Sequence, residues 1–144
     1  MARVHHSAIV VRDVDASLRF WRDGIGLAVM MDRSFDGDWA ALFDAPGSTL
    51  RSVFLGDPDA ADAGVVELVS FGPEAREPVV AGPAPGFFLL SLYLDVEAAL
   101  ERLAALGLGG PPRRITVAGP RGAVVPMATV RDPDGVLVEL IGQP

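Results

Sequence analysis

Residues 13–18 (DVDASL) reappear as residues 95–100 (DVEAAL), a shift of 82 positions (95 − 13). In each copy an apolar stretch comes first, then an acidic residue, and then apolar residues at helical spacing. An aspartate at such a junction is a preferred helix N-cap. Each copy therefore predicts a strand followed by a helix, and the repetition predicts a chain built from two similar halves.

Each half also closes with a matching strand segment, residues 65–69 (VVELV) and residues 137–141 (LVELI). Each segment places one carboxylate, Glu67 or Glu139, inside an apolar run. A charge in apolar surroundings is costly unless another group pairs with it. The two acids therefore indicate a pocket formed by duplication, and that pocket is where we expect function.

Hydrophobic runs and turn residues between these segments predict the remaining elements. We expect a βαβββ unit over residues 1–72, a linker with four prolines over 73–86, and a second βαβββ unit over 87–144. The predicted fold class is α+β. The predicted strands are 4–11, 27–31, 50–55, 65–69, 87–94, 114–117, 124–130 and 136–141, and the predicted helices begin near Asp13 and Asp95.

Composition excludes several kinds of function. The net charge is −7, which argues against nucleic acid and anionic membranes as partners. All twelve basic residues are arginine, so lysine Schiff-base chemistry is excluded. Cysteine is absent, which excludes disulfides and thiolate sites. No secretory pattern or membrane-length apolar run is present, and we expect a cytoplasmic protein.

Alternation of side chains along a strand assigns faces. His6 shares one face of the first strand with Ala8 and Val10, while His5 has the opposite parity and is expected at the surface. In the fifth strand, the more apolar leucines should pack on a helix. The opposite parity, which comprises Leu89, Ser91 and Tyr93, should face the pocket.

Several segments together resemble the vicinal oxygen chelate superfamily, the group of glyoxalases, bleomycin-type resistance proteins and extradiol dioxygenases. They are residues 6–13 (HSAIVVRD), 20–23 (FWRD), 26–27 (GL) and 132–140 (DPDGVLVEL). The resemblance implies two βαβββ modules whose eight strands form an open, barrel-like sheet around a cavity, with the helices outside. It is specific for the fold and weak for the reaction, because one fold hosts many chemistries.

The resemblance also implies a metal site. Its members draw ligands from the first and last strands of each module, which here gives His6, Glu67 and Glu139. The expected fifth-strand histidine is replaced by Leu89. Imidazole and two carboxylates suit Zn²⁺, Ni²⁺, Mn²⁺ or Fe²⁺, and Glu67 or Glu139 would also move a proton. Without a metal, the same residues would line a cavity that admits water.

Other side chains are candidates for contact with a small-molecule substrate, although ordinary packing or solvation explains each one equally well. Arg51 and Arg114 offer charge for a carboxylate, and Met31 and Phe43 offer apolar surface. The substrate-binding candidates are Leu89, Ser91, Tyr93, Trp39, Phe54 and Arg51.

Two functions compete. The first is a metal-assisted isomerase, lyase or oxygenase that acts on a small, vicinally oxygenated organic molecule. The second, favoured by Leu89 and an apolar cavity, is a metal-free protein that sequesters an aromatic antibiotic or metabolite. The resemblance also implies a homodimer, although the two modules of one chain can close a cavity by themselves, so the sequence does not choose between dimer and monomer.

Overall fold

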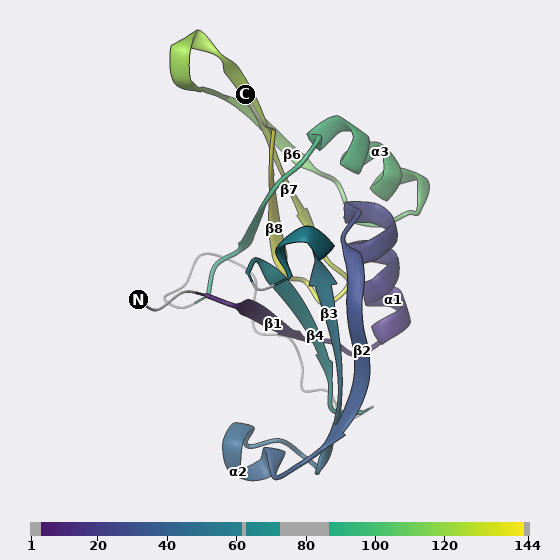
Figure 1. Ribbon diagram of the computed structural model, residues 1–144. Coiled ribbons are helices and arrows are strands. Elements are labelled where there is room, and N and C mark those ends of the chain that lie inside the picture. Colours follow the sequence, from purple (N-terminus) through teal and green to yellow (C-terminus); the bar gives the residue numbers. More distant parts are fainter. Residues whose placement is uncertain (1–3, 62, 73–86, 143–144) are drawn as a thin grey trace. The chain divides into compact units, whose positions relative to one another are not determined.

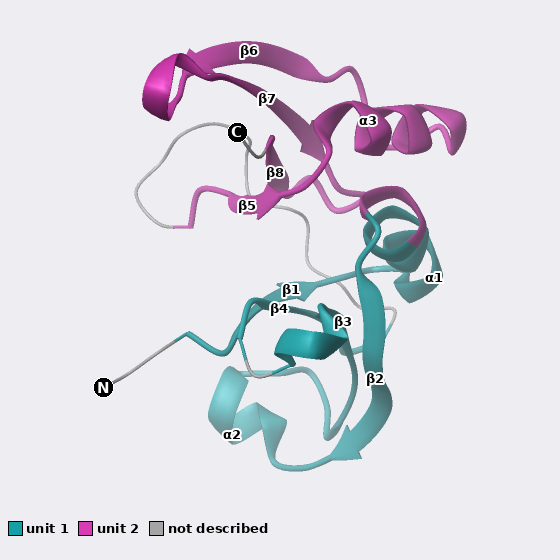
Figure 2. Ribbon diagram, turned by 45° about the horizontal axis from the view of Figure 1, so that its top comes forward, with its two compact units in different colours: residues 1–22, 26–77 teal, residues 23–25, 78–144 magenta. Residues whose placement is uncertain are grey.

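The computed structural model describes residues 4–61, 63–72 and 87–142 (Figure 1). The chain divides into two compact units (Figure 2). Unit 1 comprises Met1–Arg22 and Gly26–Glu77, and unit 2 comprises Asp23–Ile25 and Pro78–Pro144. The predicted linker, 73–86, lies outside the described residues.

Unit 1 holds a four-stranded mixed sheet in the order β1-β4-β3-β2, in which β1 and β4 are parallel and the other pairs are antiparallel. The short α1 runs on into a helical segment, Arg19–Ile25, that ends at Gly26 with a φ of 97°. Glycine adopts this left-handed conformation without steric cost. The elements are β1 (His6–Val10), α1 (Val14–Leu18), β2 (Ala28–Asp36), α2 (Trp39–Phe43), β3 (Thr49–Gly56) and β4 (Val65–Ser70).

Unit 2 repeats this topology, with the strand order β5-β8-β7-β6 and a parallel β5–β8 pair. The predicted α+β class and the two βαβββ modules are therefore confirmed. The elements are β5 (Leu90–Tyr93), α3 (Val96–Ala105), β6 (Arg113–Ala118), β7 (Val124–Arg131) and β8 (Leu137–Ile141). In the part of the chain that the structure describes, no helix has the length and apolar character needed to span a membrane.

Each sheet buries one face. In unit 1, α1 packs on the sheet near β4, and Leu68, Val53 and Leu55 are fully buried. In unit 2, α3 packs near β7, and Val138 and Leu140 are fully buried. Because side chains alternate along a strand, Glu67 and Glu139 point to the other face of their sheets, away from these buried neighbours.

Two predicted strand boundaries were wrong, and one helix was not predicted. The second strand runs to Asp36 rather than to residue 31, because an antiparallel hairpin with β3 continues through its polar half. The fifth strand begins at Leu90 rather than at residue 87. Helix α2 was predicted as loop; its five residues are too few for a periodic signal, and Asp38 accepts a hydrogen bond from the Ala41 amide at its start.

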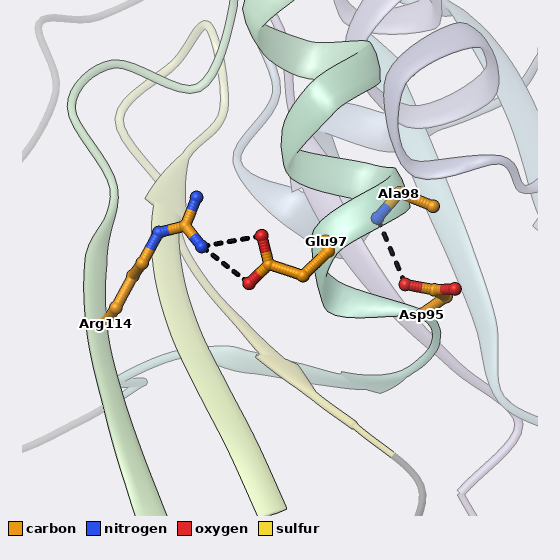
Figure 3. Close-up of polar contacts among 4 residues, drawn as sticks. All are labelled: Asp95, Glu97, Ala98 and Arg114. Carbon is orange, nitrogen blue, oxygen red and sulfur yellow. Dashed lines mark hydrogen bonds and ion pairs between the residues drawn. The ribbon is translucent and has the colours of Figure 1, made fainter.

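The helix caps follow the prediction. Asp13 accepts a hydrogen bond from the Ala16 amide (3.1 Å), and Asp95 accepts one from the Ala98 amide (3.0 Å). Figure 3 shows the second cap beside an ion pair between Glu97 of α3 and Arg114 of β6.

Removing the second cap should weaken unit 2. We expect Asp95→Ala to lower the free energy of unfolding by about 1 kcal/mol, because the amides at the start of α3 lose their acceptor. Urea unfolding measures this change. Glu101→Ala, at an exposed position of the same helix, is the control and should change stability little. Equal effects of the two substitutions would contradict the capping role.

Candidate functional site

Three polar side chains meet on the face of the unit 1 sheet that carries Glu67. His6 Nε2 lies 3.2 Å from Glu67 Oε2, and Ser52 Oγ donates a 2.6 Å hydrogen bond to Glu67 Oε1. The strands bring them together because Glu67 of β4 lies between Ala8 of β1 and Phe54 of β3. His6 and Ser52 each lie two residues along those strands, on the same face.

Both oxygens of the Glu67 carboxylate therefore have a partner. Its side chain is 15% exposed, Ser52 is buried, and the His6 side chain is 39% exposed. Burying a carboxylate without partners is costly, and here a hydroxyl and an imidazole contact its two oxygens. Glu67 is therefore paired in this structure, and the role of the pair as a site stays a prediction.

A small aromatic cluster surrounds His6. The Phe54 ring centroid lies 5.6 Å from that of His6 and 6.0 Å from that of His5. His5 Nδ1 also lies 2.9 Å from His6 Nδ1. His5 is exposed, as expected for a surface residue. Its ring nevertheless lies against His6 and Phe54, because it precedes the first residue of β1 and strand alternation does not govern its side chain.

In unit 2 the corresponding acid is Glu139, which is half-buried. In the strand register it lies between Ser91 of β5 and Thr129 of β7, and Tyr93, which is 72% exposed, follows on the same face. The predicted face for Ser91 and Tyr93 thus coincides with that of Glu139. Extending the β5–β8 register by one residue places Leu89 opposite Leu137, as His6 is placed opposite Val65.

Leu89 is therefore the positional equivalent of His6, and unit 2 presents an alkyl side chain where unit 1 presents an imidazole. Ser52 likewise has no polar equivalent, because the residue opposite Ile141 in β7 is Met127, whereas Ser52 is opposite Val69. The two halves share a backbone pattern and one acid each, but in the described part of the chain the positions equivalent to His6 and Ser52 are apolar in unit 2.

The donor set can be compared with what a divalent ion needs. An imidazole nitrogen and a carboxylate oxygen are both suitable ligands, and in unit 1 these atoms already face one another. His6 and Glu67 therefore fit such an ion. Within residues 4–61, 63–72 and 87–142, no three His, Cys, Asp or Glu side chains gather as a complete ligand set. Glu139 belongs to unit 2, and its place as a third ligand stays a prediction.

Arg51 has a partner of its own. Its Nε and Nη2 donate hydrogen bonds to the two carboxylate oxygens of Asp32, at 2.9 and 2.7 Å. Arg51 precedes Ser52 in β3 and so points to the opposite face of the sheet. It is therefore not part of the site that we propose. Arg114 similarly pairs with Glu97.

The Asp32–Arg51 pair predicts a small loss of stability in acid. The hydrogen bonds from Arg51 hold the pKa of the Asp32 carboxyl below its ordinary value, against an opposing effect of burial. The pair's contribution is therefore complete above the ordinary carboxyl pKa and is lost as the pH falls through the lower, folded value. Because both side chains are more than a third exposed, we expect at most about 1 kcal/mol.

Urea unfolding of the wild type and of Asp32→Asn, from neutral pH into acid, measures this contribution. The difference between the two proteins should shrink as the pH falls. A difference that grows in acid would contradict the assignment.

The predicted aromatic residues separate into two places. Phe54 adjoins the histidines, whereas the Trp39 ring stacks on Phe43 with centroids 5.8 Å apart. The indole Nε1 of Trp39 donates to the Phe35 carbonyl at 3.1 Å, and a Cβ at Gly37 would lie 2.9 Å from the ring. These contacts hold Trp39 at α2. Among the contacts that the structure describes, none joins it to His6 or Glu67.

Sequence reasoning missed Ser52 and Thr129. The signal for Ser52 was available, because it has the same parity as Phe54 in a predicted strand. Thr129 lies beside Glu139 only through the register of β7 and β8, which a single sequence does not specify.

Comparison with known proteins identifies the superfamily to which the chain belongs. The model of the glyoxalase, bleomycin resistance protein and dioxygenase superfamily matches residues 3–140. A lactoylglutathione lyase-like protein of Aspergillus terreus, terB, is 36% identical over 98% of this chain and 75% of its own length. The chain therefore belongs to this superfamily.

More distant relatives agree. The lactoylglutathione lyase of Schizosaccharomyces pombe is 27% identical over 98% of this chain and 47% of its own length. A glyoxalase family protein of Bacillus cereus is similar in structure, with a TM-score of 0.73, 20% identity, and 99% and 94% of the two chains covered. The trypanothione-dependent glyoxalase I of Leishmania major has a TM-score of 0.62 and 23% identity, over 99% and 87% of the chains. These two structures support the fold alone.

Proposed function

We propose that this chain is a glyoxalase-like enzyme that moves a proton on a small, vicinally oxygenated molecule with the help of a divalent metal ion. The observation that carries the proposal is the approach of His6 Nε2 to Glu67 Oε2 at 3.2 Å, with Ser52 bound to the other carboxylate oxygen. The relatives named lactoylglutathione lyase or lyase-like support the same class of reaction.

Different roles suit the two acids. Ser52 and His6 hold Glu67 in place, which suits a ligand that must not move. Among the described residues, the structure records no hydrogen bond or ion pair to the Glu139 side chain, which suits a group that changes its contacts during the reaction. We therefore assign His6 and Glu67 as fixed ligands. Glu139 is assigned as a third ligand that also takes up and returns a substrate proton.

When bound, the ion would polarise the substrate's carbonyl oxygen and stabilise the negative charge that develops there. The chain's own contribution is to place a base beside the carbon that loses its proton. Ser91, beside Glu139 in the strand register, can orient a substrate hydroxyl. Tyr93, exposed on the same face, can cover the substrate's apolar part.

The test uses protein purified without a histidine tag, stripped with a chelator, and titrated with Zn²⁺, Ni²⁺, Mn²⁺ or Fe²⁺ by calorimetry. Substrates would include the adduct of glutathione with a 2-oxoaldehyde and a panel of 2-hydroxy carbonyl compounds. Exchange of their carbon-bound hydrogen in D₂O should depend on the ion. Failure to take up any of the four ions would remove the proposal.

One observation favours a second function. Leu89 occupies the position in unit 2 that His6 occupies in unit 1, and a metal-free protein that sequesters an aromatic metabolite or antibiotic has no need of a ligand there. Calorimetry with a panel of aromatic antibiotics distinguishes the two functions. Tight binding by chelator-treated protein, without hydrogen exchange in any substrate, would favour sequestration.

A further inference from the structure

We propose that His5 is a positioning residue that fixes the ring of His6 for its role beside Glu67. This inference rests on the proposed function, because it concerns the same site. His5 Nδ1 lies 2.9 Å from His6 Nδ1. The two imidazoles therefore share one hydrogen bond, through the nitrogen of His6 that does not face the carboxylate.

The position of His5 is fixed by contacts of its backbone and of its ring. The His5 carbonyl accepts a hydrogen bond from the Val65 amide at 3.3 Å, which ties its backbone to β4. Its ring also contacts Phe54, at 6.0 Å between centroids, and Phe54 contacts His6 at 5.6 Å. Backbone and ring thus hold His5 on the face that carries Glu67.

The two nitrogens of the His6 ring thus have different partners. Nε2 lies 3.2 Å from the Glu67 carboxylate, and Nδ1 shares a hydrogen bond with His5 in which one nitrogen donates and the other accepts. Without His5, the Nδ1 of His6 would have only water as a partner, and the ring would be held from the Glu67 side alone.

The same pair serves a metal-bound state. A ligand imidazole that binds through Nε2 carries its proton on Nδ1 and needs an acceptor there, and such outer partners orient the ring and raise its basicity. His5 supplies that acceptor by carrying its proton on Nε2 instead. An imidazole suits this position because it can either donate or accept at Nδ1.

Two substitutions separate this role from packing. His5→Phe keeps an aromatic ring against Phe54 and removes the nitrogen. His5→Asn places an amide, which can donate or accept, at the δ position. The chain contains only two histidines, so imidazole NMR spectra of metal-free, tag-free protein report the order of each ring directly. Equal melting temperatures would establish that all variants are folded.

We expect the His6 ring to be as ordered in His5→Asn as in the wild type, and more mobile in His5→Phe. Zinc affinity should fall about 10- to 100-fold in His5→Phe and stay near the wild-type value in His5→Asn. A His6 ring that is equally ordered in His5→Phe would overturn the inference while leaving the proposed function intact. If the wild type takes up no metal and has no turnover, the proposed function fails, and the ring-order measurement still decides the role of His5.

Discussion

Glu139→Gln is expected to lower kcat by about 10²- to 10⁴-fold, the usual cost of losing a positioned general base. The amide keeps the size of the side chain and an oxygen for the ion but cannot take up the substrate proton. At saturating metal concentration the variant should therefore bind the ion and the substrate yet fail to exchange the substrate's carbon-bound hydrogen. Steady-state kinetics and exchange in D₂O measure this loss.

Glu67→Gln is the matched control in the other module. Because Glu67 is assigned as a fixed ligand, its amide should weaken metal affinity, and activity should recover in part when the metal concentration is raised. The assignment would be contradicted if Glu139→Gln kept activity within about tenfold of the wild type, below the usual range for such a base. If raising the metal concentration restored no activity in Glu67→Gln, Glu67 would be the base and Glu139 the fixed ligand.

The second large effect is structural. Leu68 is fully buried and follows Glu67 in β4. It therefore anchors this strand, which carries the acid, to the core. We expect Leu68→Ala to lower the free energy of unfolding by about 2–5 kcal/mol, from lost apolar contacts and the cavity left behind. That is a large share of the stability of a typical domain. Chemical denaturation measures it.

Leu140 is the equivalent residue in β8, also fully buried and next to Glu139. Leu140→Ala should therefore cost about as much as Leu68→Ala. Val10→Ala, on the 58% exposed Val10 of β1, should cost far less. A loss at Leu68 no larger than at Val10 would mean that β4 is not the core strand described above.

The fold was predictable from sequence because its signals are local and occur twice. Asp13 and Asp95 each precede a helical pattern and act as caps, and the runs around Glu67 and Glu139 became β4 and β8. The polar half of β2 was not predictable, because Asp32 and Arg33 extend a strand only through pairing with β3. Helix α2 is one turn long. The contacts that hold its Trp39 include Phe35 and Gly37, which lie before the helix in the sequence.

The candidate site was predictable in part. The pairing of His6 with Glu67 follows from strand parity together with the resemblance, and the structure brings both side chains together. The contributions of Ser52 and His5 depend on side-chain geometry that parity does not specify. His5 is exposed as predicted, but its ring contacts to His6 and Phe54 were not predictable, because the residue lies just before β1. Arg51 was a reasonable candidate by charge alone, but its partner Asp32 is set by the β2–β3 register.

The most direct test of the central claim is a crystal structure of the protein soaked with zinc, with the ion located by its anomalous scattering. The account predicts one strong peak within coordination distance of His6 Nε2 and Glu67 Oε2. A peak elsewhere, or a His6–Glu67 pair that stays closed without an ion at saturating zinc, would contradict it.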